Sequence, residues 1–346
     1  MSLLFLKSKK IACTTFKTLF CIFFLCFLIF SPMIVFNSSN YKLNFSNLFE
    51  SEETSKCVLT LHHIETFEGG TFSREKYLQK QAVKFNKQHK NCYIVVKTLT
   101  LSDLVLNLAD NNKADIYSFS CGAGELLAGL LKELNDNKNI RDDLVEYGKC
   151  VGKLLAYPYI LSGYALFSYD NLLDATNNPN DYIKSKKIGK KEYKGVSLKS
   201  GTSNVLIENN IVVQEDDQQI FSSSYEAYQN FLKKNSVSLL GTSRDLARLK
   251  NREEKGTISD IRYTFLGGYS DLVQYVGVIE SGNSFKEYFA DLFAQFLTTD
   301  TCQNDLSNYG LFSTNGKNIY SSGEYFDFEN KLKNKLKSKN VFEKIN

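Results

Sequence analysis

Aromatic and charged side chains recur beside glycines at several turns of this sequence, a combination that could hold a small polar molecule. The set consists of Phe67 and Glu68 before Gly69-Gly70, Tyr157 and Tyr159 around Pro158, Arg244 and Asp245 after Gly241, and Tyr269 after Gly267-Gly268. An aromatic ring supplies apolar area against one face of a solute, while arginine or a carboxylate fixes its polar groups by directed hydrogen bonds. Singly, each residue also suits a structural role, as a half-buried ring or a surface ion pair. Together they predict a binding cleft.

Several other classes of function are disfavoured. The sequence has no nucleophile-elbow, zinc-protease or phosphate-loop motif. His62 and His63 are adjacent in an expected strand, so they point to opposite faces and are poorly placed to share a metal. A net charge of +4 over 346 residues is too small to indicate nucleic-acid binding. We therefore expect no enzymatic activity, no cofactor and no metal.

Five cysteines follow the N-terminal apolar stretch: Cys57, Cys92, Cys121, Cys150 and Cys302. Because their number is odd, they cannot all pair within one chain, and their spacing matches no zinc or haem motif. Cys57 and Cys92 begin neighbouring expected strands. A disulfide between these two is therefore an alternative to free thiols.

The N-terminal region predicts export. Four lysines within the first 17 residues precede residues 18–36, which carry no charge. That length suits a helix across a bilayer, and the lysines favour an N-terminus kept in the cytoplasm. No convincing cleavage site follows, so we favour an uncleaved anchor over a cleaved signal. The chain would then lie at the outer face of the cytoplasmic membrane, or be secreted if the segment is cleaved.

Strand and helix patterns alternate from Cys57 onward. The expected strands are 57–65, 93–99 and 115–120, and the expected helices are 73–90, 101–109 and 122–134. In helix 73–90 the N-cap is Ser73, and the apolar stripe consists of Tyr77, Leu78, Ala82, Val83 and Phe85. This alternation predicts a parallel sheet covered on both faces. Ligands of such sheets lie beyond the carboxyl ends of the strands, at helix N-termini.

The remaining patterns predict a second group of elements. The expected order is a strand, turn and helix over 195–213, a helix over 225–234, a strand and helix over 237–253, strands within 263–280 and a helix over 285–297. Pro158 suggests that the chain leaves one sheet for another there. Residues 326–345 predict a basic, partly amphipathic surface helix that is solvated, with contact to a membrane surface as the alternative.

Three stretches carry a resemblance to a known family. They are LLAYPYILSGYALFSYDNLL at 154–173, GGYSDLVQYVGVI at 267–279 and FAQFLTTDTCQNDLSNYGLF at 293–312, with its Q-x-x-L-x-x-Y-G-x-F pattern. In these stretches, and in the strand that leads into the Glu68-Gly69-Gly70 turn, the chain resembles the extracellular solute-binding proteins of ABC importers. That family includes the maltose-binding and other sugar-binding lipoproteins. The resemblance covers about residues 57–320.

The resemblance implies an α/β, two-lobed fold like that of the type II periplasmic binding proteins, whose hinge closes the lobes on ligand. The chain would cross between lobes near residues 158–163, 264–268 and 311–317. The implied division is a cytoplasmic basic segment at 1–17, a transmembrane anchor or signal at 18–36, a tether at 37–56, lobe 1 at 57–160 and 265–313, and lobe 2 at 161–264 and 314–346.

The family's cleft positions, carried over by motif, fall on Phe67, Glu68, Gly69, Cys121, Tyr157, Tyr159, Thr202, Arg244 and Tyr269. Three features differ from the sugar-binding members. The chain has no Trp to serve as a stacking platform. Arg244-Asp245 stands where some members have an aromatic pair after a glycine, and the lipid-attachment cysteine is missing. The first two differences admit an anionic or amino-bearing ligand, and the third suggests a protein that is anchored by its own helix or shed.

The function that the resemblance implies is capture of a small polar solute for the permease subunits of an ABC transporter. A sugar or oligosaccharide is the leading ligand. One alternative is a membrane-anchored sensor of the same fold that signals to a membrane partner. The other is a hydrolase on the two-lobed scaffold, which would pair two carboxylates about 5 to 9.5 Å apart across the cleft.

Overall fold

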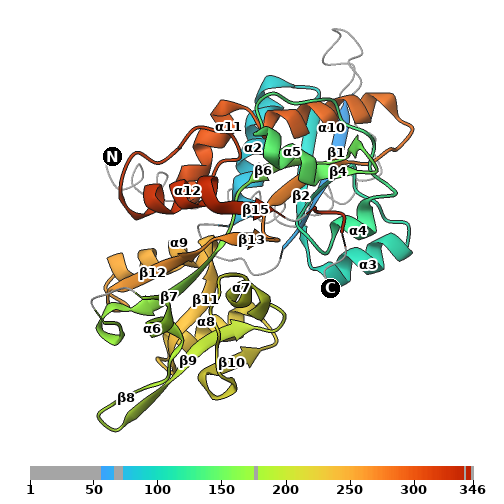
Figure 1. Cartoon of the computed structure of the whole chain (residues 1–346). Helices are drawn as coiled ribbons and strands as arrows, with labels where there is room; N and C mark the ends of the chain where they lie inside the picture. Colours follow the sequence, from blue (N-terminus) through green and yellow to red (C-terminus); the bar gives the residue numbers. More distant parts are fainter. Residues whose placement is uncertain (1–55, 66–72, 175–177, 339, 344–346) are drawn as a thin grey trace, which may run out of the picture. The chain divides into compact units, whose positions relative to one another are not determined.

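The computed structural model describes residues 56–65, 73–174, 178–338 and 340–343, which belong to one compact unit of the chain. The predicted anchor at 18–36 and the predicted site residues Phe67, Glu68 and Gly69 lie outside these ranges. Among the described helices, none is both long and apolar enough to cross a membrane. Figure 1 shows two sheets, each with its own helices, which we call lobe 1 and lobe 2.

Lobe 1 is built on a five-stranded sheet of order β2-β1-β3-β14-β6. Its strands are β1 (Cys57–Ile64), β2 (Cys92–Leu99), β3 (Ile116–Phe119), β6 (Tyr157–Ile160) and β14 (Gln274–Val278). β1 runs parallel to β2 and β3, as expected, but β14 runs antiparallel to both β3 and β6. The sheet is therefore mixed rather than parallel, because β14 enters from the other lobe at the end of a long excursion of the chain.

Three helices of lobe 1, over 74–88, 101–109 and 284–296, form where the periodicity predicts them. The helices of this lobe are α2 (Arg74–Gln88), α3 (Leu101–Ala109), α4 (Gly124–Leu127), α5 (Asp142–Val145), α10 (Ser284–Phe296) and α11 (Asp300–Asp305). Ser73 caps α2 by accepting from the N–H of Lys76, and Tyr77, Leu78, Ala82 and Phe85 are buried. Val83, expected in the same stripe, is 53% exposed. α2 packs on β2 and against α10, which in turn packs on β1 and β14.

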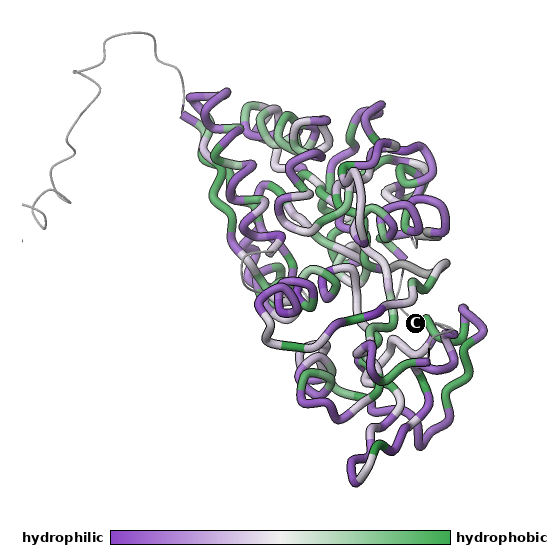
Figure 2. The backbone as a smooth tube through the Cα atoms, turned by 90° about the vertical axis from the view of Figure 1, so that its left-hand side faces the viewer, coloured by the Kyte–Doolittle hydropathy of each residue, from purple (hydrophilic) through white to green (hydrophobic). Residues whose placement is uncertain are grey.

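Lobe 2 is built on a sheet of order β10-β9-β11-β7-β12, with β8 paired to β9. Its strands are β7 (Tyr164–Tyr169), β8 (Lys186–Ile188), β9 (Lys191–Lys199), β10 (Gln218–Phe221), β11 (Ser236–Thr242) and β12 (Ile261–Leu266). Its helices are α6 (Pro179–Ile183), α7 (Ser203–Glu208), α8 (Ser224–Leu232) and α9 (Ser243–Glu254). α8 packs on the sheet through Phe231, whose ring stacks on Tyr169 with centroids 4.8 Å apart. In Figure 2 the outer parts of the backbone tube carry long hydrophilic stretches in purple, while much of the interior is white and green.

Three segments connect the lobes. Residues 161–163 lead from β6 into β7, and residues 267–273 lead from β12 back to β14. In the third segment, Phe312 forms an antiparallel bridge with Leu161 of the first. These positions agree with the crossings that the resemblance implied near 158–163, 264–268 and 311–317. The short strands β13 (Gly268–Ser270) and β15 (Leu336–Ser338) pair in parallel beside the second crossing.

The side chain of Gln303, which is fully buried, ties the third crossing to β6, just before the first crossing. Its amide nitrogen donates to the carbonyl of Tyr159 at 3.0 Å and to that of Leu297 at 2.8 Å. Its amide oxygen accepts from the hydroxyl of Ser313 and the backbone N–H of Thr314, both at 2.9 Å. One side chain thus provides hydrogen bonds to backbone groups that no sheet or helix ladder reaches.

Two expectations for helices are wrong. The helix expected to continue to Leu134 ends at Leu127, and Leu131 forms an antiparallel bridge with Ile279. The basic C-terminal helix does form, as α12 (Gly323–Lys335), but it is not fully solvated, because Phe328, Glu329 and Leu332 are buried. Phe328 packs against Phe312, with ring centroids 5.3 Å apart. The periodicity of the sequence did not predict the buried face of α12, because the residues that cover this face lie on β12 and the third crossing.

The division into lobes also needs a correction at the C-terminal end. Residues 314–346 were assigned to lobe 2. Instead, the N–H of Val341 donates to the carbonyl of Tyr147 at 3.0 Å, and the side-chain amide of Asn340 donates to the carbonyl of Lys149 at 2.8 Å. The carbonyl of Val341 also lies where a side chain at Gly124 would stand. The end of the described chain therefore packs on lobe 1, between two short strands, β4 (Lys149–Cys150) and β5 (Lys153–Leu154), and α4.

The five cysteines of the described residues are free thiols. Cys57 and Cys92 are register partners at the start of β1 and β2, as the strand assignment predicted. Burial raises the pKa of both thiols, that of Cys92 to about 12. Both therefore stay protonated and unreactive at neutral pH, and the structure contains the free-thiol alternative rather than the disulfide.

Replacement of Gln303 by alanine is expected to destabilise the fold by about 3 kcal/mol, because buried backbone groups lose their partners. Urea unfolding with an unchanged m-value would measure this. Gln79→Ala is the matched control. Gln79 is exposed on α2 and bonds only to Glu75 within its own helix, so its change should stay within about 0.5 kcal/mol. Equal effects at both positions would show that Gln303 does not hold the crossings.

Candidate functional site

A small cavity of about 30 Å³ lies where residues of both lobes meet. Its lining includes Arg74 and Ser120 from lobe 1, Ser162 from the first crossing, and Thr242, Arg244 and Arg248 from lobe 2. Such a volume holds about one or two water molecules. A larger guest would need the two lobes to move apart.

Arg244 reaches across this cavity from the first turn of α9. The side chain is only 5% exposed. Its Nη1 atom donates to the carbonyl of Tyr309, 3.1 Å away in lobe 1. Its Nε and Nη2 atoms are buried and have no hydrogen-bond partner. A buried N–H without a partner costs stability, and more so on a charged group.

Asp245 lines the same cavity but is committed to other groups. Its Oδ2 accepts from the backbone N–H of Thr242 at 2.8 Å, which completes a capping box at the start of α9. Its Oδ1 accepts from Nη1 of Arg248 at 2.9 Å. The carboxylate next to Arg244 in the sequence is thus used to cap the helix and to pair with the following arginine.

Arg74, the first residue of α2, faces the cavity from lobe 1. Its Nη1 donates to Oε1 of Gln274 on β14 at 2.5 Å, and Gln274 donates in turn to Oγ of Ser118 on β3 at 3.1 Å. The same hydroxyl lies 2.8 Å from Nδ1 of His63 and 2.7 Å from the hydroxyl of Tyr159. Four strands of lobe 1 therefore hold one guanidinium through a fully buried chain of polar side chains.

This supporting chain carries no negative charge. Burial, together with the nearby Arg74, lowers the pKa of His63 well below its usual range, so the imidazole is neutral at pH 7. Burial also raises the pKa of Tyr159. The chain therefore orients Arg74 without neutralising it.

Arg74 and Arg244 are both shielded from water at the cavity. Burial, with the neighbouring Arg248, lowers the pKa of Arg244 to about 9. Burial, with Arg244, lowers the pKa of Arg74 to about 9. Since each folded pKa lies below its unfolded value, the charged groups lower stability at every pH below about 9, and the penalty is relieved only as pH rises past that value.

Of the residues that the sequence predicted for the site, Arg244 lines the cavity. Tyr159 lies beneath it, in the chain that holds Arg74. Tyr157 shares the same face of β6, but helices cover that face. The hydroxyl of Tyr157 donates to the carbonyl of Asn135.

Cys121 follows the cavity residue Ser120, and its thiol contacts the carbonyl of Asn340. Thr202 donates to the carbonyl of Lys199 within its own turn, outside the cavity lining.

The other predicted positions lie outside the described part of the chain. They are Phe67, Glu68 and Gly69, which follow β1, and the side chain of Tyr269, whose backbone lies in β13. No contact of these groups with the cavity is described. Their assignment to the site stays a prediction.

Sequence reasoning missed Arg74, Arg248, Ser162 and Gln274. One signal was available for Arg74. A cation in the first turn of a helix opposes the helix dipole, so its presence directly after the N-cap Ser73 was unusual. Gln274 and Ser162 carry no such signal, because their roles depend on residues more than 80 positions away.

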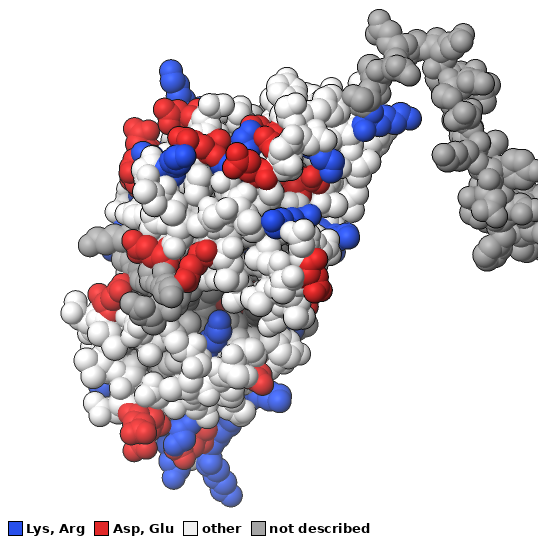
Figure 3. Space-filling view, turned by 90° about the vertical axis from the view of Figure 1, so that its right-hand side faces the viewer, with Lys and Arg blue, Asp and Glu red and all other residues white. Residues whose placement is uncertain are grey.

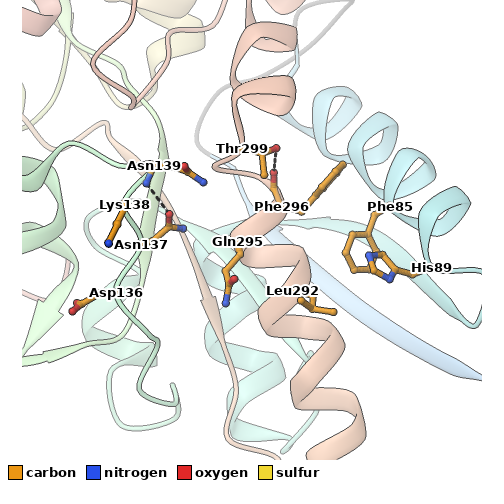
Figure 4. Close-up of a pocket in the computed structure, with 10 residues that line it drawn as sticks. All are labelled: Phe85, His89, Asp136, Asn137, Lys138, Asn139, Leu292, Gln295, Phe296 and Thr299. Atoms are coloured by element: carbon orange, nitrogen blue, oxygen red, sulfur yellow. Dashed lines mark hydrogen bonds between the residues drawn. The ribbon is translucent and has the colours of Figure 1, made fainter.

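A second depression, with a volume of about 370 Å³, lies within lobe 1 (Figure 4). Phe85 and His89 at the end of α2 form one wall with Phe296 of α10, and residues 136–139 lie opposite. The aromatic rings there pack on one another, with Phe85 and His89 centroids 4.3 Å apart. This groove has no contribution from lobe 2, so closure of the lobes would not enclose a guest in it.

The face drawn in Figure 3 gives no further candidate by charge. On the face drawn in Figure 3, acidic and basic side chains are interspersed rather than gathered into one large patch of a single sign. Among the described residues, no cluster of His, Cys, Asp and Glu side chains could hold a metal ion. The cavity with its buried arginines is therefore the best candidate for a binding site.

Comparisons with known proteins identify the fold. The GacH receptor of Streptomyces glaucescens, solved unliganded and with acarbose, gives a TM-score of 0.62 at 12% identity, over 83% of this chain and 88% of the receptor. The ABC substrate-binding protein Lmo0181 of Listeria monocytogenes, solved with cycloalternan, gives 0.59 at 13% identity, over 82% and 88%. Thiaminase I of Clostridium botulinum, solved with thiamin, gives 0.56 at 15% identity, over 82% and 94%.

These likenesses confirm the two-lobed, periplasmic-binding-protein-like fold that the sequence resemblance implied. No family model and no curated protein sequence matches the chain. The same fold carries an enzyme, thiaminase I, as well as binding proteins. At 11 to 15% identity the comparisons establish the fold alone.

Arg244→Met is expected to stabilise the ligand-free protein by about 1 kcal/mol, because it removes a buried cation with two unpartnered nitrogens. Urea unfolding without added ligand would measure the gain. The matched control is Arg262→Met. Arg262 pairs with the exposed carboxylate of Asp170, and its loss should cost less than about 1 kcal/mol. A loss of about 3 kcal/mol or more in Arg244→Met would mean that the guanidinium is already compensated in the free protein.

Proposed function

We propose that this protein captures a small polar solute between its two lobes and delivers it to the permease subunits of an ABC transporter. The observation that carries the proposal is the cavity itself. It is lined from both lobes, beside the crossings, on a fold shared with proteins named as ABC substrate-binding proteins. In this mechanism ligand binds when the lobes are open, and closure buries it.

Closure requires a ligand that contacts both lobes. A guest that touched one lobe alone would bind open and closed forms equally and would shift neither. Here Arg74 approaches from lobe 1 and Arg244 from lobe 2. A solute that engages both arginines therefore has the differential affinity that drives closure.

A carbohydrate is the leading ligand class. The structures of GacH and Lmo0181 were solved with acarbose and cycloalternan, respectively. The described cavity lining of this chain also contains hydroxyl groups of Ser120, Ser162 and Thr242, which can exchange hydrogen bonds with a hydroxylated guest.

A binding role is favoured over catalysis by the chemistry of the cavity. Among its described lining residues the carboxylate is Asp245, and both of its oxygens already accept hydrogen bonds. The pair of free carboxylates that a glycoside hydrolase needs is thus not provided by the described lining. Thiaminase I on the same fold keeps an enzymatic role as the second candidate.

The proposed place of action is the outer face of the cytoplasmic membrane. Support comes from the sequence, in which lysines flank the uncharged stretch at 18–36. This segment would anchor the protein near its permease, or would direct secretion if it is cleaved.

A thermal-shift screen of the purified chain against sugars, oligosaccharides, amino acids and polyamines should find a stabilising ligand. A ligand at about 100 times its Kd is expected to add about 2.7 kcal/mol to the free energy of unfolding. Mass spectrometry of the recovered ligand should find it unchanged. A ligand that is converted to product would favour the enzymatic candidate, and a screen in which no compound stabilises the chain would contradict solute capture.

A further inference from the structure

We propose that the solute carries an anionic group, a carboxylate or a phosphate, and that Arg244 and Arg74 bind it at the starts of α9 and α2. This inference rests on the proposed function, because it names the ligand class of the same cleft. The supporting observation is that two buried nitrogens of Arg244 have no hydrogen-bond partner. The alternative within the same function is a neutral sugar.

The unused capacity of Arg244 has a defined geometry. Nε–H and one N–H of Nη2 point in the same direction along one edge of the planar guanidinium, and this edge matches the two oxygens of a carboxylate or phosphate. These two nitrogens are the ones without a partner, while Nη1 is held by the carbonyl of Tyr309. The contact with Tyr309 fixes the plane of the group, so the free edge has a fixed direction.

The described lining of the cavity offers Arg244 no free carboxylate. Asp245 is committed to the helix cap and to Arg248. The buried side chains that hold Arg74 through Gln274 are neutral, although the carboxylate of Glu65 also acts on Arg74 and favours its charged form. Tyr309 offers Arg244 a carbonyl rather than a carboxylate. The free edge of Arg244 therefore has no anionic partner in the described lining.

Two helix N-termini add to this positive potential. α2, of 15 residues, begins at Arg74, and α9, of 12 residues, begins one residue before Arg244. Helix starts present free N–H groups and favour anions, so a cation placed there is normally unfavourable. An anion bound between the N-termini of α2 and α9 would attract both arginines, so that their positions there would become favourable.

The rest of the lining indicates what else the solute contains. Hydroxyl groups of Ser120, Ser162, Ser224 and Thr242 surround the arginines, and the aliphatic side chain there is Leu272. No aromatic ring belongs to the described lining, and the chain has no Trp. Selection by charge and hydroxyl hydrogen bonds suits a small hydroxylated acid, such as a sugar acid or a sugar phosphate, better than a neutral sugar held by stacking.

Three ligands that share one ring isolate the anionic group: glucose, glucuronate and glucose 6-phosphate. Isothermal titration calorimetry of the full chain should give at least 100-fold tighter binding for one of the two anions than for glucose. Arg244→Gln and Arg74→Gln should each remove most of that difference. Arg244→Lys, which keeps the charge but lacks the two-nitrogen edge, should give an intermediate affinity. The matched control, Arg262→Gln, should bind like the wild type.

Inorganic phosphate provides a test that does not depend on the sugar. At millimolar phosphate the wild-type melting temperature should rise relative to chloride at equal ionic strength, and Arg244→Gln should lose this rise. If phosphate acts as expected but no compound with a sugar ring binds, the anion site stands and capture of a sugar fails. If glucose binds as tightly as both anions, and Arg244→Gln is without effect, solute capture stands and the anionic inference is overturned. Absence of any effect of phosphate and of both anionic sugars also overturns it.

Discussion

The junction between β6 and the third crossing depends on the hydrogen bonds of one buried side chain. Where a chain passes from one sheet to another, its backbone leaves both ladders, and its buried N–H and C=O groups need other partners. Gln303 provides these partners to β6, to the end of α10 and to the third crossing. The same amide therefore links the end of β6 to the third crossing.

Charge is the second organising feature. Most ionic groups of the described chain lie near the surface, in pairs whose energies are small. Arg74 and Arg244 are different, because both are buried at helix starts and their pKa values are lowered. Buried cations at helix starts lower stability, and proteins retain such an arrangement where a functional site needs it. The buried chain from Arg74 through Gln274 to Ser118 keeps one guanidinium oriented before any ligand arrives, which reduces the entropy lost on binding.

Fold and chemistry provide different information about this protein. The shared fold accounts for the two lobes, and the same fold serves acarbose binding in GacH and an enzyme in thiaminase I. Ligand class has to come from the residues of the cleft. Here the described cleft has arginines and hydroxyls in place of aromatic platforms, so the fold and the chemistry point to related but different solutes.

Local sequence signals determined most of the elements. β1, α2, β2 and α3 lie within about two residues of their predicted bounds, because side-chain periodicity and caps such as Ser73 act over a few residues. The resemblance added the two lobes and the crossings. Tertiary structure alone decided that β14 joins the first sheet in the antiparallel direction, that α12 buries Phe328, and that Arg74 and Arg244 line one cavity. Those outcomes join residues about 60 to 170 positions apart, and no local pattern encodes a contact whose partners meet only after both lobes have folded.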